Sequence, residues 1–410
     1  MPYIQRAITP ILKQRVSTSK CMLLVGARQV GKSTLIKHEF KDFNRANFDD
    51  RLTRMQAKEE PKLFLLNNPQ PLFIDEVQKE SSILEDIKQI VDESDERGMF
   101  LLSGSQKLEL MKGMSESLAG RVSISELTGL SMREIYGVKF NRHFIPTDAY
   151  IKEREKEIVK YDNIWEIIHK GSYPELYDID RDWQEYYSSY VATYLERDIN
   201  ELVAADGITF TKFLTAVAAR TGELLNYSNI AGDVGVSEPT IKNWISILER
   251  TGIVYLLQPY SASALKRAIK TPKIYFRDTG LACYLTRWLT ADTLKCSAVA
   301  GNMFETFVVS EILKSYSNEG KDYRFNIFYY RGKDRNASGE NEIDLVIEED
   351  GVLYPVEIKM SGNPRADMGA MNQVLDKVSD KKRGLGVILC LIDKKTYLRE
   401  NLVALPIEFI

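Results

Sequence analysis

LLVGARQVGKSTL, residues 23–35, decides the fold of the N-terminal part of the chain. An apolar run ends at Gly26, and Gly31, Lys32 and Ser33 follow at the spacing of a P-loop, GxxxxGK and then Ser or Thr. Glycine residues let the backbone turn tightly and approach an anion closely, and the amide groups that open the next helix face that anion. The stretch therefore predicts a phosphate-binding loop between a strand and a helix.

The expected ligand of this loop is ATP with Mg²⁺. Lys32 can place its charge between the β- and γ-phosphates, and the Ser33 hydroxyl can bind the metal ion. A chance match with a structural role is the alternative, and the apolar run before the loop argues against it. The nucleotide-binding residues predicted from the motif are Gly26, Ala27, Arg28, Gln29, Val30, Gly31, Lys32, Ser33 and Thr34.

A second apolar run, PLFIDEVQ at residues 71–78, ends in two carboxylates. We expect Asp75 to hold Mg²⁺ through water and Glu76 to polarise the water that attacks the γ-phosphate. Taken alone, an Asp-Glu pair would indicate a solvated strand end, but the P-loop upstream favours the functional interpretation. Lys32, Asp75 and Glu76 together predict an enzyme that hydrolyses ATP.

Four further residues are candidates for completing the nucleotide site. In LLSGSQ, residues 101–106, Ser103 or Ser105 could sense the γ-phosphate, and either hydroxyl could equally cap the next helix. Arg121 in SLAGRVSI and Arg197 in YLERDI could supply a cation, from the same chain or from a neighbouring subunit. A structural ion pair is the alternative for each arginine.

The composition is that of a globular protein with several domains, since 410 residues exceed a typical single domain. No run reaches the roughly 20 apolar residues of a membrane helix, and the first residues lack a secretory signal, so we expect a cytoplasmic protein without a membrane partner. The four cysteines show no CxxC spacing, which argues against zinc and disulfides. A net charge of −3 means that nucleic-acid contact would need a local basic patch.

We expect an α/β multidomain fold. Apolar runs at residues 21–27, 71–77 and 99–105 alternate with helical stretches, which predicts a parallel sheet covered by helices on both faces. Long helices follow this first part, then a helix-turn-helix with a wing, and then a second alternation of helix and strands. The expected parts are a P-loop core (1–140), a helical lid or linker (141–205), a winged-helix-like domain (206–275) and a C-terminal α/β domain (276–410).

The helix-turn-helix is a candidate for nucleic-acid binding. Its presumed recognition helix at residues 238–250 begins at the N-cap Ser237 and carries no net charge, which is poor for holding phosphates. A basic stretch after the wing could contact the backbone instead, and Asn243 could reach a base edge. The alternative is a protein-packing module. The basic residues are Lys266, Arg267, Lys270 and Lys273, and the apolar face of the helix is Ile241, Trp244, Ile245 and Leu248.

EIDLVIEEDGVLYPVEIK, residues 342–359, predicts two strands joined by a short hairpin. Glu357 and Lys359 share one face of their strand because side chains alternate, and Asp344 can lie beside them on the paired strand. Two carboxylates and a lysine can bind Mg²⁺ and activate water for phosphodiester cleavage. An exposed and solvated strand is the alternative, since Glu-x-Lys is a common sequence.

The spacing of these carboxylates resembles the PD-(D/E)xK nuclease pattern, and with it a restriction-endonuclease-like α/β fold. Glu305 in GNMFETF resembles the additional acidic residue that such folds carry on a helix, and Glu342 is a less expected spare ligand. The resemblance therefore implies a metal site formed by Glu305, Asp344 and Glu357, with Lys359 as its cation. Such folds also serve as inactive binding scaffolds, so the fold does not establish cleavage.

The chain as a whole resembles a widespread prokaryotic family of AAA+ ATPases whose C-terminal half is a domain of unknown function. The resemblance implies an AAA+ core, a winged-helix element and a nuclease-like C-terminal fold, but no settled biological role. Gly171 and Ser172 stand where the family often has two glycines, so the turn there differs. The resemblance rests on LLVGARQVGKSTL, LFIDEVQ, LLSGSQ, SLAGRV, GSYPEL, YLERDI, RTGELLNYSNIAGDVGVSEPTIKNWISILERTGI, KIYFRDTGLACYL, GNMFETFVVSEI, EIDLVI and YPVEIK.

Three interpretations of the whole chain follow. The leading one is an ATPase that couples ATP turnover to the binding or processing of DNA or RNA, as a homo-oligomer if an arginine acts between subunits. The second is an ATP-dependent regulatory switch whose C-terminal fold is an inactive scaffold for protein or DNA. The third, a DNA-binding module with a vestigial nucleotide site, is disfavoured by Asp75 and Glu76.

Overall fold

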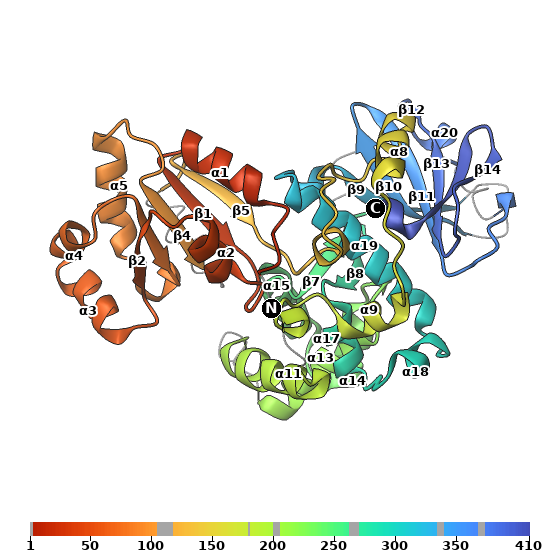
Figure 1. The fold of residues 1–410 in the computed structure, drawn as a ribbon. Coiled ribbons are helices and arrows are strands. Elements are labelled where there is room, and N and C mark those ends of the chain that lie inside the picture. Colours follow the sequence, from red (N-terminus) through yellow and green to blue (C-terminus); the bar gives the residue numbers. More distant parts are fainter. Residues whose placement is uncertain are drawn as a thin grey trace.

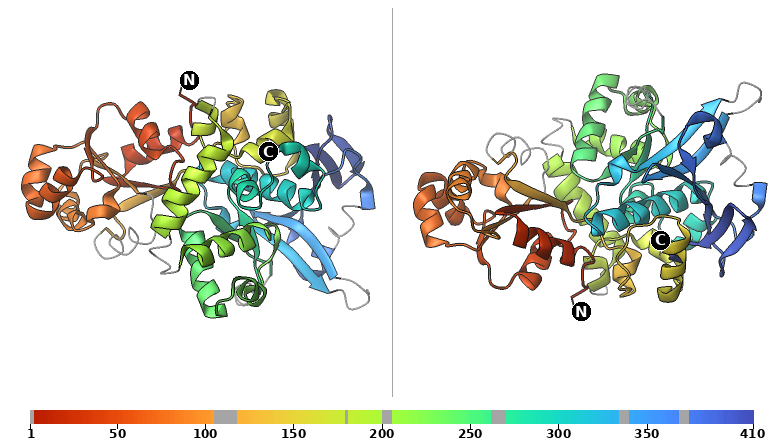
Figure 2. Two further views of the ribbon diagram at one scale, coloured as in Figure 1. Left: turned by 90° about the horizontal axis from the view of Figure 1, so that it is seen from below. Right: turned by 90° about the horizontal axis from the view of Figure 1, so that it is seen from above.

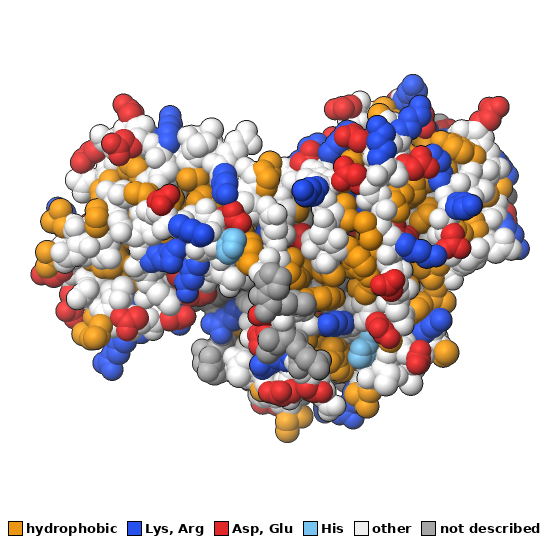
Figure 3. Space-filling view, in the orientation of Figure 1, with side chains coloured by type: hydrophobic (Ala, Val, Ile, Leu, Met, Phe, Trp, Pro, Cys, Tyr) orange, Lys and Arg blue, Asp and Glu red, His pale blue; other side chains and the backbone are white. Residues whose placement is uncertain are grey.

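The structure is a computed structural model in which two sheets lie on either side of a group of helices (Figure 1). The N-terminal sheet is at the left of the figure, the C-terminal sheet is at the right, and helices from the middle of the chain lie between and below them. In the space-filling view a notch along the upper edge separates the N-terminal from the C-terminal part (Figure 3). The structure describes residues 3–104, 118–178, 181–199, 206–261, 270–333, 340–367 and 374–410.

The N-terminal sheet is parallel throughout, as the sequence predicts, with strand order β2-β3-β4-β1-β5. Alternate residues of its strands face two separate cores, so Leu23 packs with one set of helices and Leu24 with the other. Two of the strands, β2 and β5, lie outside the apolar runs expected from the sequence. The strands are β1 (Cys21–Val25), β2 (Asn44–Asn47), β3 (Leu72–Asp75), β4 (Phe100–Gly104) and β5 (Val122–Glu126).

Helices cover both faces of this sheet and explain why β1, β3 and β4 are buried along their whole length. Strand β4 lies between the strand that precedes the P-loop and the strand that ends in Asp75. The carboxyl ends of all three strands therefore meet at one edge of the sheet. The covering helices are α1 (Thr9–Thr18), α2 (Lys32–Glu39), α3 (Arg51–Glu59), α4 (Pro61–Asn67) and α5 (Ile83–Glu93), with a short η1 (Val77–Glu80).

The next part of the chain, as far as residue 199, is helical where the structure describes it. A buried cluster of tyrosines forms its core, with Tyr187 and Tyr190 on α11 and Tyr173 in the turn between α9 and α10. The element η3 is a π-helix, which is a rare conformation that often occurs at functional sites. The elements are α7 (Met132–Ile135), α8 (Asp148–Arg154), η2 (Glu155–Glu157), α9 (Ile164–Lys170), α10 (Glu175–Asp178), α11 (Trp183–Tyr190) and η3 (Val191–Ile199).

Three helices and a small antiparallel sheet of order β6-β8-β7 follow. Helix α15 begins where the sequence predicts, because the Ser237 hydroxyl accepts a hydrogen bond from Thr240 N and Pro239 occupies the first turn. Its apolar face, including Trp244, is buried. The elements are α13 (Gly207–Ala218), β6 (Glu223–Leu224), α14 (Tyr227–Val234), α15 (Glu238–Arg250), β7 (Val254–Leu257) and β8 (Lys273–Phe276).

The C-terminal part is a mixed sheet of order β14-β15-β13-β11-β10-β9, with β12 beside β11. Helix α19 (Ala300–Asn318) packs on this sheet and on β8, and all but three of its 19 residues are buried. The other elements are α17 (Thr279–Leu285), α18 (Ala291–Lys295), η4 (Tyr323–Phe325), β9 (Ile327–Lys333), β10 (Glu340–Glu349), β11 (Val352–Lys359), α20 (Leu375–Val378), β12 (Lys382–Arg383), β13 (Gly386–Cys390), β14 (Thr396–Arg399), β15 (Leu402–Pro406) and η6 (Ile407–Phe409).

The parts are joined closely, and the N-terminal end lies about midway along the length of the molecule, at its edge (Figure 2). Helices α17 and α18 contact α9 of the middle helices, although the expected boundary at residue 275 assigns them to the C-terminal domain. The segment after β7 pairs with the edge strand β9, since Tyr260 N donates to Tyr329 O at 2.6 Å. Within the described ranges, no helix combines the length and the apolar character that crossing a membrane requires.

Candidate functional site

The loop between β1 and α2 has the backbone that the P-loop motif predicts. Gly31 has φ of 92°, a left-handed conformation that favours glycine, and it is the N-cap of α2. A Cβ atom on Gly26 would lie 2.2 Å from the carbonyl oxygen of Leu127, so this position admits no side chain. The geometry of the loop therefore requires glycine at both of these positions of the motif.

The loop opens into a cavity of about 540 Å³, which is within the size range of ligand sites. One side of the cavity is the P-loop and the first turn of α2. The other sides come from the N-terminal segment, from Leu130, and from the turn that leads into α10. The lining residues are Tyr3, Ile4, Arg6, Arg28, Gln29, Gly31, Lys32, Ser33, Thr34, Glu76, Leu130, Pro174, Glu175 and Asp178.

Lys32 is buried in this cavity and bonds to its own loop. Its Nζ donates to the carbonyl oxygens of Gly26 at 3.0 Å and Ala27 at 2.9 Å. Burial lowers the pKa of Lys32 to about 8, against the opposing attraction of Glu76 and Asp75. A phosphate group would offer this ammonium a charged partner in place of two neutral carbonyls, so the lysine fits the role that the motif predicts.

Asp75 and Glu76 stand at the end of β3, beside the P-loop. The buried carboxylate of Asp75 accepts a hydrogen bond from the Ser103 hydroxyl on the neighbouring strand β4. Glu76 has φ of 54°, which is uncommon for a residue with a side chain, and its carboxylate accepts a hydrogen bond from Gln78 Nε2. The structure thus brings together Lys32, Asp75 and Glu76, and a role for Ser103 as a phosphate sensor stays a prediction.

Arg6 is the site residue that the sequence does not reveal. It is 3% exposed, and its guanidinium donates to Val30 O at 2.8 Å, to Thr128 O at 2.7 Å and to Glu134 Oε1 at 2.9 Å. It therefore fixes the N-terminal segment, the P-loop and the segment after β5 to one another. No local pattern marks it, because its partners lie 24 to 128 positions away along the chain.

The arginine candidates have different outcomes. Arg121 precedes the first residue of β5, at the edge of the sheet opposite to the P-loop, and pairs there with Asp92. A role for Arg121 within its own chain does not fit this position, because the parallel strands place it a strand length from the phosphates. The side chain of Arg197 and the whole of Ser105 lie outside the described residues. Arg28 lies over the ring of Tyr194 in η3 at 5.1 Å.

At the C-terminal sheet, Asp344 of β10 and Glu357 of β11 share one lysine. Lys359 Nζ is 2.9 Å from Asp344 Oδ2 and 2.9 Å from Glu357 Oε2. Asp344 Oδ2 also accepts a hydrogen bond from Ile358 N at 2.7 Å. Burial, with the charge of Asp344 adding to it, raises the pKa of Glu357 to about 8. These three side chains lie together as the sequence predicts.

Glu305 does not join them in this structure. Its Oε1 accepts a hydrogen bond from Tyr275 OH at 2.6 Å and pairs with Lys273 Nζ at 3.2 Å. Among the side chains that the structure describes, no three His, Cys, Asp or Glu residues come close enough to hold a metal ion. The expected set of three carboxylate ligands is therefore not assembled, and Glu305 pairs with Lys273 and Tyr275 instead.

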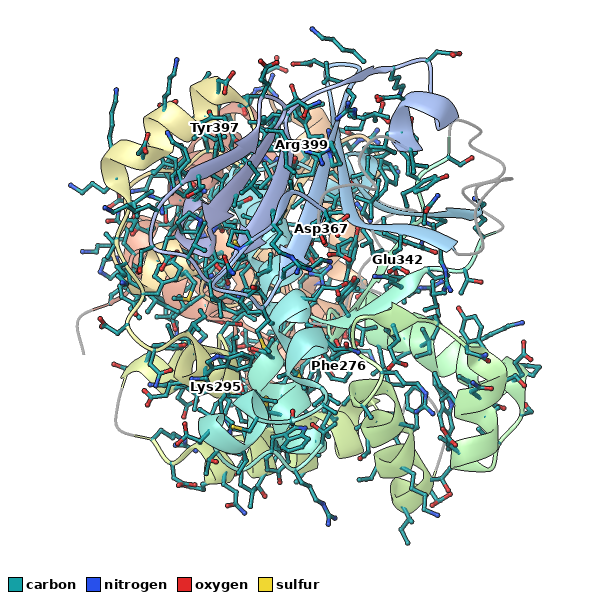
Figure 4. The ribbon with its side chains drawn as sticks, turned by 90° about the vertical axis from the view of Figure 1, so that its right-hand side faces the viewer. Phe276, Lys295, Glu342, Asp367, Tyr397 and Arg399 are labelled. Atoms are coloured by element: carbon teal, nitrogen blue, oxygen red, sulfur yellow. The ribbon has the colours of Figure 1, made fainter. Side chains whose placement is uncertain are left out.

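The prediction that Lys273 belongs to an exposed basic patch after the wing is wrong. Glu342, on β10, stands at the side of the C-terminal sheet that faces the helices α13 to α15 (Figure 4). Lys273 is buried between Glu305 and Glu342 and does not face solvent. The sequence shows its charge but not that the strand carrying it packs against carboxylates from the C-terminal part. Lys270 and Asn243 are exposed. Lys266 and Arg267 lie outside the described residues.

In comparisons with known proteins, three parts of the chain each match a different protein family. Residues 18–136 match a family described as AAA domain, and residues 161–292 and 300–410 match two domains of unknown function, DUF8612 and DUF4143. Uncharacterized proteins of Mycobacterium bovis and Mycobacterium tuberculosis are each 27% identical over 375 residues, which cover 89% of this chain and 76% of theirs.

Two solved structures show a low similarity to this chain. The Walker-type ATPase of Pyrococcus abyssi is 14% identical, with 68% of this chain and 94% of that chain covered and a TM-score of 0.43. The ORC2 protein of Aeropyrum pernix in its ADP form is 15% identical, with 75% and 96% covered and a TM-score of 0.32. Residues 18–136 thus match an AAA domain, and they contain the P-loop with its buried lysine and much of the cavity.

Proposed function

We propose that the protein couples ATP turnover in this domain to nucleic-acid processing at a metal site in its C-terminal sheet. The observation that carries the proposal is the grouping of Asp344, Glu357 and Lys359 on two neighbouring strands. Glu357 Oε1 is buried and has no hydrogen-bond partner among the described residues. Burying two carboxylates around a single ammonium costs folding free energy. A purely structural role therefore does not explain why both are present.

A divalent cation fits this donor set. Asp344 and Glu357 would hold Mg²⁺ or Mn²⁺ through oxygen, which is the ligand that hard cations prefer. The ion would activate water and stabilise charge on a phosphodiester. Lys359 would then lose its carboxylate partners in part and could orient water or contact the substrate phosphate. Glu305 remains the candidate for a third ligand, provided that Lys273 releases it.

At the nucleotide site, the assignments made from the sequence fit the cavity. Lys32 would contact the phosphates, Ser33 and Asp75 would hold Mg²⁺, and Glu76 would polarise the attacking water. Gly26 and Gly31 give the loop the shape that this requires. The AAA match supports ATP as the nucleotide, and the closeness of Glu76 to Lys32 supports hydrolysis.

DNA or RNA is the proposed substrate class. The order α13, β6, α14, α15, β7, β8 supports a winged-helix interpretation of residues 206–275, because the described residues of this range form three helices and a three-stranded sheet in that order. On α15, Asn243 is exposed and Lys242 pairs with Glu238 at 2.7 Å. The helix thus offers few cations for phosphate groups. We therefore expect this element to make contacts with nucleic acid but to supply little of the binding affinity.

A regulatory switch is the second candidate function. It is favoured by the pairing of Lys273 with Glu305 and Glu342, which neutralises part of the carboxylate group without any metal. In such a switch the ATPase domain would act on a C-terminal scaffold that binds protein or nucleic acid but does not cut it. The two functions share the ATPase and differ only in the chemistry at Asp344 and Glu357.

Metal binding and cleavage by the full chain test the proposal. Without nucleotide, Mn²⁺ should raise the melting temperature, since a ligand that binds only the folded state stabilises it. Asp344→Asn should abolish the rise, whereas Asp376→Asn, an exposed carboxylate paired with Arg383 in the same part, should not.

With ATP present, cleavage of supercoiled, linear, single-stranded DNA or RNA should be lost in Lys359→Ala while the Mn²⁺ effect on melting persists. Metal stabilisation without cleavage of any nucleic acid favours the regulatory switch. Absence of Mn²⁺ stabilisation without nucleotide, together with absence of cleavage with ATP, rejects the metal site. The ATPase rate, measured with and without each nucleic acid, shows whether the substrate reaches the ATPase domain.

A further inference from the structure

The walls of the nucleotide cavity differ in chemistry from one side to the other. The P-loop side, with Lys32 and Ser33, carries the groups that suit phosphates. The wall formed by α10 carries two carboxylates instead, Glu175 and Asp178, which are three residues apart and so share a face of the helix. Because a carboxylate repels phosphate groups, this wall suits a part of the nucleotide that donates hydrogen bonds.

A nucleotide such as ATP offers hydrogen-bond donors at two places. One is the ribose with its hydroxyl groups, and the other is the exocyclic amine of adenine. The ribose is joined directly to the phosphates, whereas the amine is on the far side of the base. A carboxylate that stands close to the P-loop is therefore nearer to the ribose than to the amine.

Glu175 stands close to the P-loop. The residue before it, Pro174, lies against the loop, since a Cβ atom built on Gly31 would be 3.7 Å from Pro174 Cγ. The turn that carries Pro174 is also fixed to the segment after β5, because Leu130 N donates to Ser172 O at 2.7 Å. These contacts place Glu175 near the phosphate-binding loop, on the side of the cavity where a ribose would follow the phosphates.

Arg181 holds the Glu175 side chain at the cavity wall. Its Nη1 is 3.0 Å from Glu175 Oε1, and its Nη2 is 3.8 Å from Glu185 Oε1. The Glu175 side chain keeps 39% of its surface exposed, so this pair leaves part of the carboxylate accessible. The guanidinium also offsets the repulsion between this carboxylate and the phosphates. Glu175 can therefore accept a hydrogen bond from a group that lies next to the phosphates.

The rest of the cavity wall suits a base. Tyr3, Ile4, Leu130 and Pro174 supply an aromatic ring and three apolar side chains. Ligand cavities are mostly lined in this way, and a small number of polar groups in them fix the orientation of the ligand. Ribose hydroxyl groups that leave water need hydrogen-bond partners, and the α10 carboxylates are charged acceptors for them.

We propose that Glu175 accepts a hydrogen bond from a ribose hydroxyl group, so that the cavity selects ribonucleotides over deoxyribonucleotides. The assignment rests on the proposed function only in that a nucleotide occupies this cavity, and it does not depend on the metal site in the C-terminal sheet. A deoxyribonucleotide lacks the donor that the carboxylate would bind. Losing a hydrogen bond to a charged group weakens binding by about 10- to 100-fold.

Competition binding to the full chain tests the assignment. ADP, 2′-deoxy-ADP and 3′-deoxy-ADP, which have no γ-phosphate to lose, each displace a radiolabelled, non-hydrolysable ATP analogue in the presence of Mg²⁺. For the wild type, at least one deoxy form should bind about 10-fold or more weakly than ADP. Glu175→Ala should bring this ratio close to one. Glu185→Ala, which removes the other, more exposed carboxylate beside Arg181, should keep the ratio of the wild type.

The ratio of the dissociation constants is the readout, because releasing Arg181 from its pair changes the binding of all three nucleotides alike. Equal binding of ADP and both deoxy forms by the wild type overturns the assignment, and so does a ratio that Glu175→Ala leaves unchanged. A chain that binds neither the analogue nor ADP rejects the nucleotide site, and the assignment with it. If the ratio depends on Glu175 but Mn²⁺ neither stabilises the protein nor supports cleavage, the assignment holds and the proposed metal site fails.

Discussion

The guanidinium of Arg6 donates a hydrogen bond to the carbonyl oxygen of Val30 in the P-loop at 2.8 Å, and its Nε lies 2.9 Å from Glu134 Oε1. Both side chains are almost fully buried, with relative exposures of 3% and 1%. The N-terminal segment is thus part of the nucleotide site, since it fixes the loop that binds phosphate. Breaking such a pair leaves an uncompensated buried charge.

We expect Arg6→Ala to destabilise the protein by about 3–5 kcal/mol and to weaken nucleotide binding, because Glu134 loses its partner and Val30 its donor. Chemical denaturation and nucleotide titration measure the two effects. Lys13→Ala is the matched control, since it breaks an exposed ion pair with Glu39 that is worth about 0–1 kcal/mol. Equal losses in the two variants would contradict the role given to Arg6.

Lys32→Ala should abolish tight binding of ATP, while Glu76→Gln should keep binding and slow hydrolysis by about 10² to 10⁴-fold, the usual contribution of a general base. The difference follows from the two roles, contact with phosphate and activation of water. Binding is measured with labelled nucleotide and hydrolysis by phosphate release. Glu80→Gln, which alters a partly exposed carboxylate nearby that contacts Ser82, should hydrolyse ATP normally. Wild-type turnover by Glu76→Gln would make the assigned base wrong.

Ser103→Ala should lower the rate of hydrolysis about 10-fold and leave nucleotide affinity nearly unchanged. The Ser103 hydroxyl bonds to Asp75, and a hydrogen bond to a charged group is worth about 1.5–3 kcal/mol. The measurement is the split between kcat and KM. Ser125→Ala, which removes another buried hydroxyl from strand β5 of the same sheet, is the control. An effect of equal size there would point to packing rather than to Asp75.

If Arg121 completes the site of a neighbouring subunit, ATP turnover per chain should rise with protein concentration as subunits associate. Arg121→Ala should remove this rise. Asp92→Ala breaks the same surface ion pair from its other side and should keep the rise. A rate per chain that stays constant from monomer to oligomer would leave Arg121 with the ion pair alone.

The stability of the protein should fall as the pH falls below about 6.5, in part because of His169. Burial lowers the pKa of His169, although the hydrogen bond that its Nε2 donates to Trp288 O at 2.8 Å opposes this shift, so the folded state binds a proton less readily than the unfolded chain. The unfolded chain takes up a proton at a higher pH than the folded chain does, so acid favours unfolding. His169→Gln should reduce this dependence, and His38→Gln, at a half-exposed position, should not. Urea midpoints at several pH values measure it.

The sequence predicts the P-loop, Asp75 and the parallel sheet because each depends on a local pattern. Apolar runs mark buried parallel strands, and the spacing of glycines marks the loop. It does not predict β2, whose sequence NRAN has no apolar run, since only one of its four residues is buried. The sequence does not predict strand β5 for the same reason, because serine and glutamate interrupt its apolar residues.

The remainder of the site depends on contacts between distant segments. Arg6, Ser172 and Pro174 reach the P-loop or its cavity from other parts of the chain, and nothing in their neighbours along the sequence indicates it. Lys273 shows most clearly what sequence patterns miss. A lysine in a basic stretch predicts an exposed patch, and only the packing of β8 against α19 reveals that this lysine is buried among carboxylates.

Helix α19 has a consequence for how the protein is made. Its buried residues contact α9, α17 and β8, and they also contact strand β11 of the C-terminal sheet. Chains emerge from the ribosome at about 5–20 residues per second and domains generally fold as units. The middle helices, although synthesised first, cannot close their core until residues 300–318 have emerged. A chain terminated before this helix would keep that apolar surface open to aggregation and to chaperones.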